Sequence, residues 1–147
     1  MEDDDEGPLA GKRVLLAEDD PVAREIVAAA LQGMGLDVMI SDDGGRMMVA
    51  VASHYKAGRT PADLDLVVTD VQMPVTSGLE VVKALRKARW QTPVIVVTAF
   101  ESPEVREIAD QLDAVLLEKP IDIHVLKRVV RKLLLSPPEK RRSGPLS

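Results

Sequence analysis

Polar side chains that could do chemistry follow several short apolar runs in this chain. They are Glu18, Asp19 and Asp20 after the first run, Asp70 after a central run, Thr98 at the end of another, and Glu118 and Lys119 after the last. Clustered carboxylates repel one another unless a cation lies between them, and all-oxygen ligands favour a hard ion such as Mg²⁺. If these runs are neighbouring strands, their ends form an acidic pocket for which Mg²⁺ is the implied cofactor.

A pocket of this composition is suited to phosphoryl transfer. A carboxylate beside Mg²⁺ can act as a nucleophile toward a phosphoryl group and form an aspartyl phosphate. The main catalytic demand is neutralisation of the charge on the equatorial oxygens. We expect Mg²⁺ to take one of these oxygens, Lys119 a second, and the Thr98 hydroxyl with a backbone N–H a third.

The elements that position these residues are predicted from apolar runs that alternate with helical patterns. The predicted strands are residues 13–17, 37–41, 64–69, 93–98 and 114–117. Two helices have clear start signals, because Asp20 and Ser102 are capping residues followed by proline. We therefore expect an α/β fold with a doubly wound five-stranded parallel sheet, (βα)₅. In such a sheet the site lies beyond the carboxyl ends of the strands.

Composition limits the function classes. The 147 residues are 46% hydrophobic and 29% charged, which fits one globular domain at residues 11–135 between an acidic disordered head at 1–10 and a flexible tail at 136–147. With a net charge of −5 and 2% aromatic residues, no direct nucleic-acid binding is expected. The chain has no cysteine, so no thiolate metal site or disulfide is available. The acidic start and the absence of a long apolar stretch predict a cytoplasmic protein with no membrane contact.

Four segments together resemble the receiver domain of two-component response regulators, over about residues 12–135. They are LLAEDDP at 15–21, DVQMPVTSG at 70–78, VIVVTA at 94–99 and EKP at 118–120. Any one of these segments alone would be a weak signal, but the four in the family's order are specific. The resemblance implies a flavodoxin-like sheet with strand order 2-1-3-4-5. It also implies either a stand-alone, chemotaxis-type single-domain regulator or a receiver fragment of a longer regulator or hybrid kinase.

The resemblance also implies roles for individual residues. Asp70 would be the phosphoacceptor, contacted through its phosphoryl group by Thr98 and Lys119. The implied metal ligands are Glu18, Asp19, Asp70 and the backbone carbonyl of Gln72. Asp20 would cap a helix, and the bond between Lys119 and Pro120 would be a cis peptide.

The sequence departs from the family pattern in ways that concern its output. Family members commonly have an aromatic residue three positions before the lysine, which turns inward with the threonine on phosphorylation, whereas this chain has Leu116. Thr98, Leu116 and Phe100 are therefore the switch candidates, with Phe100 a candidate for controlling water access. Leu112 stands where glycine is common, and the segment 53–63 is longer than usual.

The predicted function is that of a phosphorylation-dependent signalling module. A histidine kinase or phosphotransfer protein would donate the phosphoryl group, and phosphorylation would change the affinity for an unknown protein output partner, as a monomer or a phosphorylation-dependent dimer. The chain would not be an enzyme, although it would assist its own phosphorylation and slow dephosphorylation. No output domain follows residue 135, an expectation that fails if the chain is a fragment.

Two other functions remain open at this point. A magnesium-dependent aspartyl-phosphate phosphatase typically carries a general-acid Asp two residues after the nucleophile, and this chain has Gln72 there. A non-phosphorylated interaction module could use the same fold, but the joint presence of Asp19, Asp70, Thr98 and Lys119 argues against it.

Overall fold

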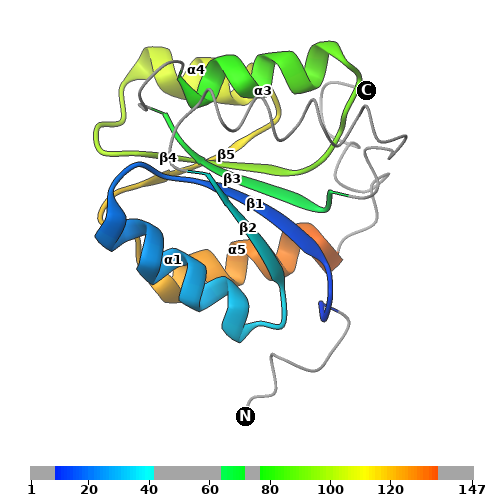
Figure 1. Ribbon diagram of the computed structural model, residues 1–147. Helices are drawn as coiled ribbons and strands as arrows, with labels where there is room; N and C mark the ends of the chain where they lie inside the picture. Colours follow the sequence, from blue (N-terminus) through cyan, green and yellow to red (C-terminus); the bar gives the residue numbers. More distant parts are fainter. Residues whose placement is uncertain (1–8, 42–63, 72–76, 136–147) are drawn as a thin grey trace.

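The computed structural model describes residues 9–41, 64–71 and 77–135 and shows one parallel sheet with helices on both faces (Figure 1). The strands are β1 (Arg13–Ala17), β2 (Asp37–Ser41), β3 (Leu66–Asp70), β4 (Val94–Thr98) and β5 (Val115–Glu118), in the order β2-β1-β3-β4-β5. The helices are α1 (Pro21–Gly33), α3 (Gly78–Lys87), α4 (Pro103–Gln111) and α5 (Ile123–Leu135). Helices α1 and α5 cover one face of the sheet, and α3 and α4 cover the other. The predicted fold class and strand order are confirmed.

Part of the prediction falls on residues that the structure does not describe. The helix expected between β2 and β3 would lie within 42–63, as does the long segment 53–63. Gln72 lies in the second gap, at 72–76. In the described part of the chain, no helix is long and apolar enough to cross a membrane.

Strand β3 lies further along the chain than its apolar run predicts. It begins at Leu66 and includes Asp70, because Asp70 pairs with Val97 and the Val71 N–H donates to the Val97 carbonyl at 2.8 Å. Leu64 is buried ahead of the strand. Asp70 is thus the last residue of a fully buried strand.

The core has two layers because successive strand residues point to opposite faces. On the α1 and α5 face, Val68 and Val97 pack with Leu31 and Leu126. On the other face, the core includes Val67, Val96, Val81, Val82, Leu85 and Trp90. Strands β3 and β4 are buried along their whole length, as expected of central strands covered on both faces.

The helix starts follow the capping rules. The Asp20 carboxylate accepts from the Ala23 N–H at 3.3 Å, and the Ser102 hydroxyl accepts from the Val105 N–H at 3.2 Å, so both predicted caps are confirmed. Ser77 caps α3 in the same way through the Glu80 N–H at 3.2 Å. Leu9, just ahead of the expected domain start at residue 11, is buried in the core beside α1.

Candidate functional site

The turn after β1 holds two carboxylates at the carboxyl edge of the sheet. The side chain of Glu18 is buried, and its Oε2 accepts from the Asp20 N–H at 3.0 Å. The Arg24 guanidinium donates to the Glu18 backbone carbonyl at 2.9 Å and fixes the turn against the first turns of α1. Asp19, between these anchored residues, is exposed.

Asp70 lies beside this turn because β3 pairs directly with β1. Glu18, Asp19 and Asp70 each offer a carboxylate oxygen, and these oxygens lie within 4.8 Å of one another. Asp70 and Glu18 are buried, whereas Asp19 is exposed. Three carboxylates this close, all with oxygen donors and one open to solvent, fit a hard divalent cation such as Mg²⁺.

Lys119 brings a positive charge to the same place from the end of β5. Its ammonium lies 2.9 Å from Asp70 Oδ2 and 3.1 Å from the Glu18 carboxylate. Its backbone N–H donates to the Thr98 carbonyl at 2.7 Å, so β4 and β5 position it jointly. The bond from Lys119 to Pro120 is cis, as the resemblance predicts.

The electrostatics of the pocket reflect burial and pairing. Burial raises the pKa of Glu18, reinforced by the Asp70 carboxylate, although the Asp20 N–H and Lys119 oppose this shift. Burial lowers the pKa of Lys119, but hydrogen bonds to Asp70 and Glu18 and their charges outweigh it, so its pKa is raised overall. The ammonium is therefore fully protonated at neutral pH and can face an anion.

Thr98 ends β4, one residue beyond the position that pairs with Asp70. Its buried hydroxyl accepts from the Phe100 N–H and donates to the Phe100 carbonyl, both at 3.1 Å. The Phe100 side chain is 80% exposed. Leu116, in β5, is half-buried and packs against the α3 and α4 layer.

The structure brings together Glu18, Asp19, Asp70 and Lys119, with Thr98 on the adjacent strand. The predicted role of the Gln72 carbonyl stays a prediction because that residue lies outside the described part. Sequence reasoning missed Arg24, whose contact to a backbone carbonyl leaves no pattern, and Thr69, whose hydroxyl donates to the Asp70 carbonyl at 3.0 Å. Gly78 was visible within the segment 70–78, but its contact with the Asp70 backbone was not.

Comparisons with known proteins show what the chain is similar to. The family model described as "Response regulator receiver domain" matches residues 14–131. The chain is 32% identical over 127 residues to Regulator of RpoS of Escherichia coli, covering 84% of this chain and 35% of that protein. It therefore spans about a third of that curated relative.

Solved structures show the same fold. The chemotaxis protein CheY4 of Vibrio cholerae superposes with a TM-score of 0.71 at 30% identity, covering 85% of this chain and all of that one. The receiver domain of Ssk1 from Saccharomyces cerevisiae, solved together with the histidine phosphotransfer protein Ypd1, gives a TM-score of 0.72 at 21% identity, covering 88% and 92% of the two chains. At that identity the second likeness concerns the fold alone.

Proposed function

Because the chain belongs to the response regulator receiver domain family, we propose that its Asp70 accepts a phosphoryl group in a Mg²⁺-dependent reaction. Receiver domains of two-component response regulators are signalling domains rather than conventional enzymes, and phosphorylation on Asp is typical of them. The observation that carries the proposal is the position of the Lys119 ammonium, 2.9 Å from Asp70 and 3.1 Å from Glu18. A cation there can stabilise an anion that forms on Asp70.

Each side chain of the site has a part in this step. An Asp70 carboxylate oxygen forms a bond to phosphorus, while the bond from phosphorus to the donor histidine nitrogen breaks and the imidazole leaves with its electron pair. Lys119 binds one phosphoryl oxygen, and the Thr98 hydroxyl gives up the Phe100 carbonyl to bind another. Glu18, Asp19, Asp70 and the Gln72 backbone carbonyl would hold Mg²⁺, which when bound supplies positive charge for the phosphoryl oxygens.

The phosphodonor is a histidine kinase or a phosphotransfer protein. The Ssk1 receiver, which has the same fold, was solved with such a phosphotransfer protein. Phosphorylation shifts the population of conformations and so changes the affinity for a protein output partner, in a cytoplasmic pathway and with the domain as a monomer or a phosphorylation-dependent dimer. The domain assists its own phosphorylation and its slow dephosphorylation.

The output route runs through the segment after β4. Leu116 is half-buried and has no ring to move, so it cannot report the state of Thr98 by an aromatic swing. Both hydrogen bonds of the Thr98 hydroxyl go to the Phe100 backbone, so a movement of Thr98 toward a phosphoryl group releases this segment. The Phe100 ring, at the same segment, limits the access of water.

The phosphatase alternative is disfavoured by chemistry. The amide of Gln72 cannot transfer a proton to a leaving alcohol, as a general acid must. Asp70 is thus a transient phosphate carrier.

The test is incubation with acetyl phosphate and Mg²⁺, followed by intact mass measurement. A gain of one phosphoryl group is expected in the wild type and in Asp110→Asn, an exposed carboxylate on α4, but not in Asp70→Asn. No gain in the wild type, with acetyl phosphate or with kinase preparations, would refute the proposal. Failure to bind beryllofluoride as well would favour a non-phosphorylated interaction module.

A further inference from the structure

The backbone carbonyl of Asp70 lies in a tight contact with the start of α3. A Cβ atom built on Gly78 would lie 2.0 Å from the Asp70 carbonyl oxygen and 2.6 Å from the Thr69 hydroxyl, where ordinary contact begins at 3.4 Å. The Gly78 N–H also donates to the Val71 carbonyl at 2.8 Å. Helix α3 therefore begins directly against the peptide that follows the predicted phosphoacceptor.

Thr69 completes this contact from the strand side. Its side chain is fully buried, and its hydroxyl donates to the Asp70 carbonyl at 3.0 Å. The carbonyl oxygen is thus held by a hydroxyl donor on one side and has room on the other because residue 78 lacks a side chain.

Helix α3 cannot easily move away to make room for a side chain. Val81, Val82 and Leu85 are at most 1% exposed and pack in the core against β3 and β4. Moving the helix by the missing distance of more than 1 Å would open voids under these three residues. The Asp70 peptide, which lies at the end of its strand, is the part that yields.

We infer that Thr69 and Gly78 are positioning residues that set the direction of the Asp70 backbone and, through it, the Asp70 carboxylate. The inference rests on the proposed function of Asp70. Phosphoryl transfer and metal binding both depend on carboxylate position, and displacements of about 1 Å can slow a reaction by about 100-fold. A side chain at position 78, or the loss of the hydroxyl at position 69, therefore weakens the chemistry of a residue that is itself unchanged.

The experiment measures two quantities on folded protein: the rate of phosphorylation by acetyl phosphate at saturating Mg²⁺, and the Mg²⁺ dissociation constant by calorimetry. For Gly78→Ala we expect the rate to fall by about tenfold or more and the dissociation constant to rise. Gly33→Ala is the matched control, because no atom lies within 4 Å of the added Cβ, and it should match the wild type. Urea denaturation of each variant gives the folded fraction to which the rates are referred.

A second pair of variants separates positioning from general destabilisation. Thr69→Val keeps the shape but loses the hydroxyl, so its rate should fall by about three- to tenfold. Thr69→Ser restores the donor and should recover to within about twofold of the wild type, even though it leaves a small void that lowers stability. If Gly78→Ala does not fold, this pair decides the question.

The outcomes distinguish the two proposals. Wild-type rates and Mg²⁺ affinities in folded Gly78→Ala, or equal losses in Thr69→Val and Thr69→Ser, overturn the inference and leave the proposed function intact. If the wild type binds Mg²⁺ without phosphorylation, the proposed function fails and the Mg²⁺ affinities still decide the inference. If the wild type does neither, both fail.

Discussion

At the scale of single residues, Lys119 balances two buried carboxylates. Its ammonium is within 3.1 Å of both Glu18 and Asp70, and its own side chain is 22% exposed. In Lys119→Met the two carboxylates lose this partner, so we expect the free energy of unfolding to fall by about 2–4 kcal/mol without Mg²⁺. Urea denaturation at pH 7 measures this loss, and added Mg²⁺ should reduce it because the cation replaces the missing charge.

Lys83→Met is the matched control for that prediction. Lys83 pairs with Glu80 at 3.4 Å on the surface of α3, and at least half of each side chain is exposed. Exposed pairs of this kind contribute less than about 1 kcal/mol. Equal losses in Lys119→Met and Lys83→Met would mean that the pocket charges are not coupled as the geometry indicates.

Substitution of Phe100 should change the lifetime of the aspartyl phosphate while leaving the stability of the fold almost unchanged. Because its side chain is 80% exposed, Phe100→Ala should change the free energy of unfolding by less than about 0.5 kcal/mol. If the ring limits water access, the aspartyl phosphate lifetime should shorten by up to about tenfold, a barrier change of at most about 1.4 kcal/mol. Mass measurements over time after removal of the donor follow the lifetime. An unchanged lifetime, equal to that of Leu135→Ala at the end of α5, would exclude the ring as the barrier to water.

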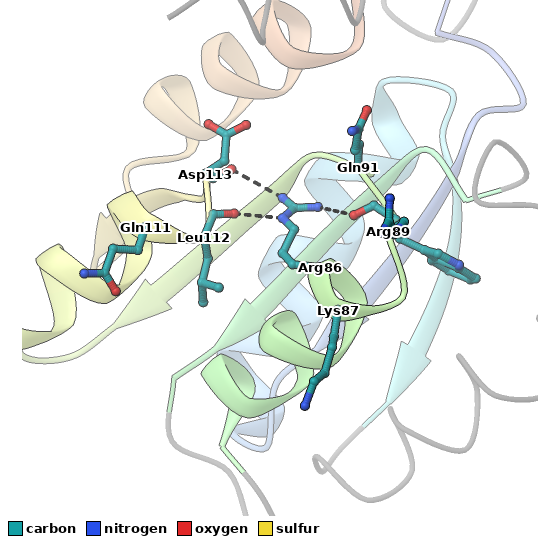
Figure 2. A pocket seen from close by; sticks show the side chains of 8 residues that line it. Arg86, Lys87, Arg89, Gln91, Gln111, Leu112 and Asp113 are labelled. Carbon is teal, nitrogen blue, oxygen red and sulfur yellow. Dashed lines mark hydrogen bonds between the residues drawn. The ribbon is translucent and has the colours of Figure 1, made fainter. Parts of the chain in front are cut away.

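At the scale of elements, Arg86 joins the end of α3 to two neighbouring segments (Figure 2). Its guanidinium donates to the carbonyls of Leu112 at 2.8 Å, Trp90 at 2.7 Å and Thr92 at 2.9 Å, and to that of Asp113 at 3.3 Å. It lines a cavity of about 530 Å³ between the end of α3 and the end of α4. These contacts hold the entries to β4 and β5, at the opposite edge of the sheet from Asp70.

Removing this guanidinium should destabilise the fold without touching the chemistry. Arg86→Met leaves several partly buried carbonyls without their donor, so we expect a loss of about 2–4 kcal/mol in the free energy of unfolding. Arg86→Lys should recover little, because an ammonium cannot reach carbonyls spread over the planar fork. Urea denaturation measures both, with the exposed neighbour Lys87→Met as control. A phosphorylation rate that fell in folded Arg86→Met would show that the two edges of the sheet are coupled.

In the turn between α4 and β5, the residue in a left-handed backbone conformation is Asp113. It lies one position after Leu112, where glycine is common in the family. Leu112 has φ −91°, whereas Asp113 has φ 57°, in the left-handed region. Relief of that conformation is partly offset by the entropy of glycine in the unfolded chain, so Asp113→Gly should raise the free energy of unfolding by about 0.5 kcal/mol. Leu112→Gly should lower it by about 1 kcal/mol or more, since it removes a side chain packed on the core. Thermal denaturation of the two variants shows whether each substitution raises or lowers the free energy of unfolding. Changes in the same direction would contradict this account.

The elements also show how far local pattern predicts this molecule. The buried runs of β3 and β4 and the capped starts of α1 and α4 are encoded within a few residues, and the shared edge of parallel strands then predicts which polar residues meet. Contacts between distant segments have no such pattern. Arg86 reaches a carbonyl 26 residues away, and Gly78 fits against Asp70 only because α3 packs on β3. The end of β3 likewise depends on its pairing with β4.

At the scale of the whole molecule, a chain of net charge −5 concentrates three carboxylates at one edge of its sheet. Lys119 compensates one of these charges, which leaves a local excess of negative charge. Binding of a divalent cation to the folded state should therefore stabilise it. At about tenfold excess over the dissociation constant, Mg²⁺ should raise the free energy of unfolding by about 1.4 kcal/mol, and K⁺ at the same ionic strength should not.

Substitution of Asp19 should raise the free energy of unfolding without Mg²⁺ and reduce the stabilisation that Mg²⁺ gives. Asp19→Asn removes an exposed carboxylate from the cluster, so without Mg²⁺ the reduced repulsion should raise the free energy of unfolding by up to about 1 kcal/mol. The same change removes a ligand, so most of the rise caused by Mg²⁺ in the wild type should disappear. Thermal denaturation with and without Mg²⁺ measures both effects, with Asp110→Asn on α4 expected to keep the wild-type response. A variant that is destabilised without Mg²⁺ would show that Asp19 does not repel its neighbours, and a variant that still responds fully to Mg²⁺ would show that Asp19 does not bind the ion.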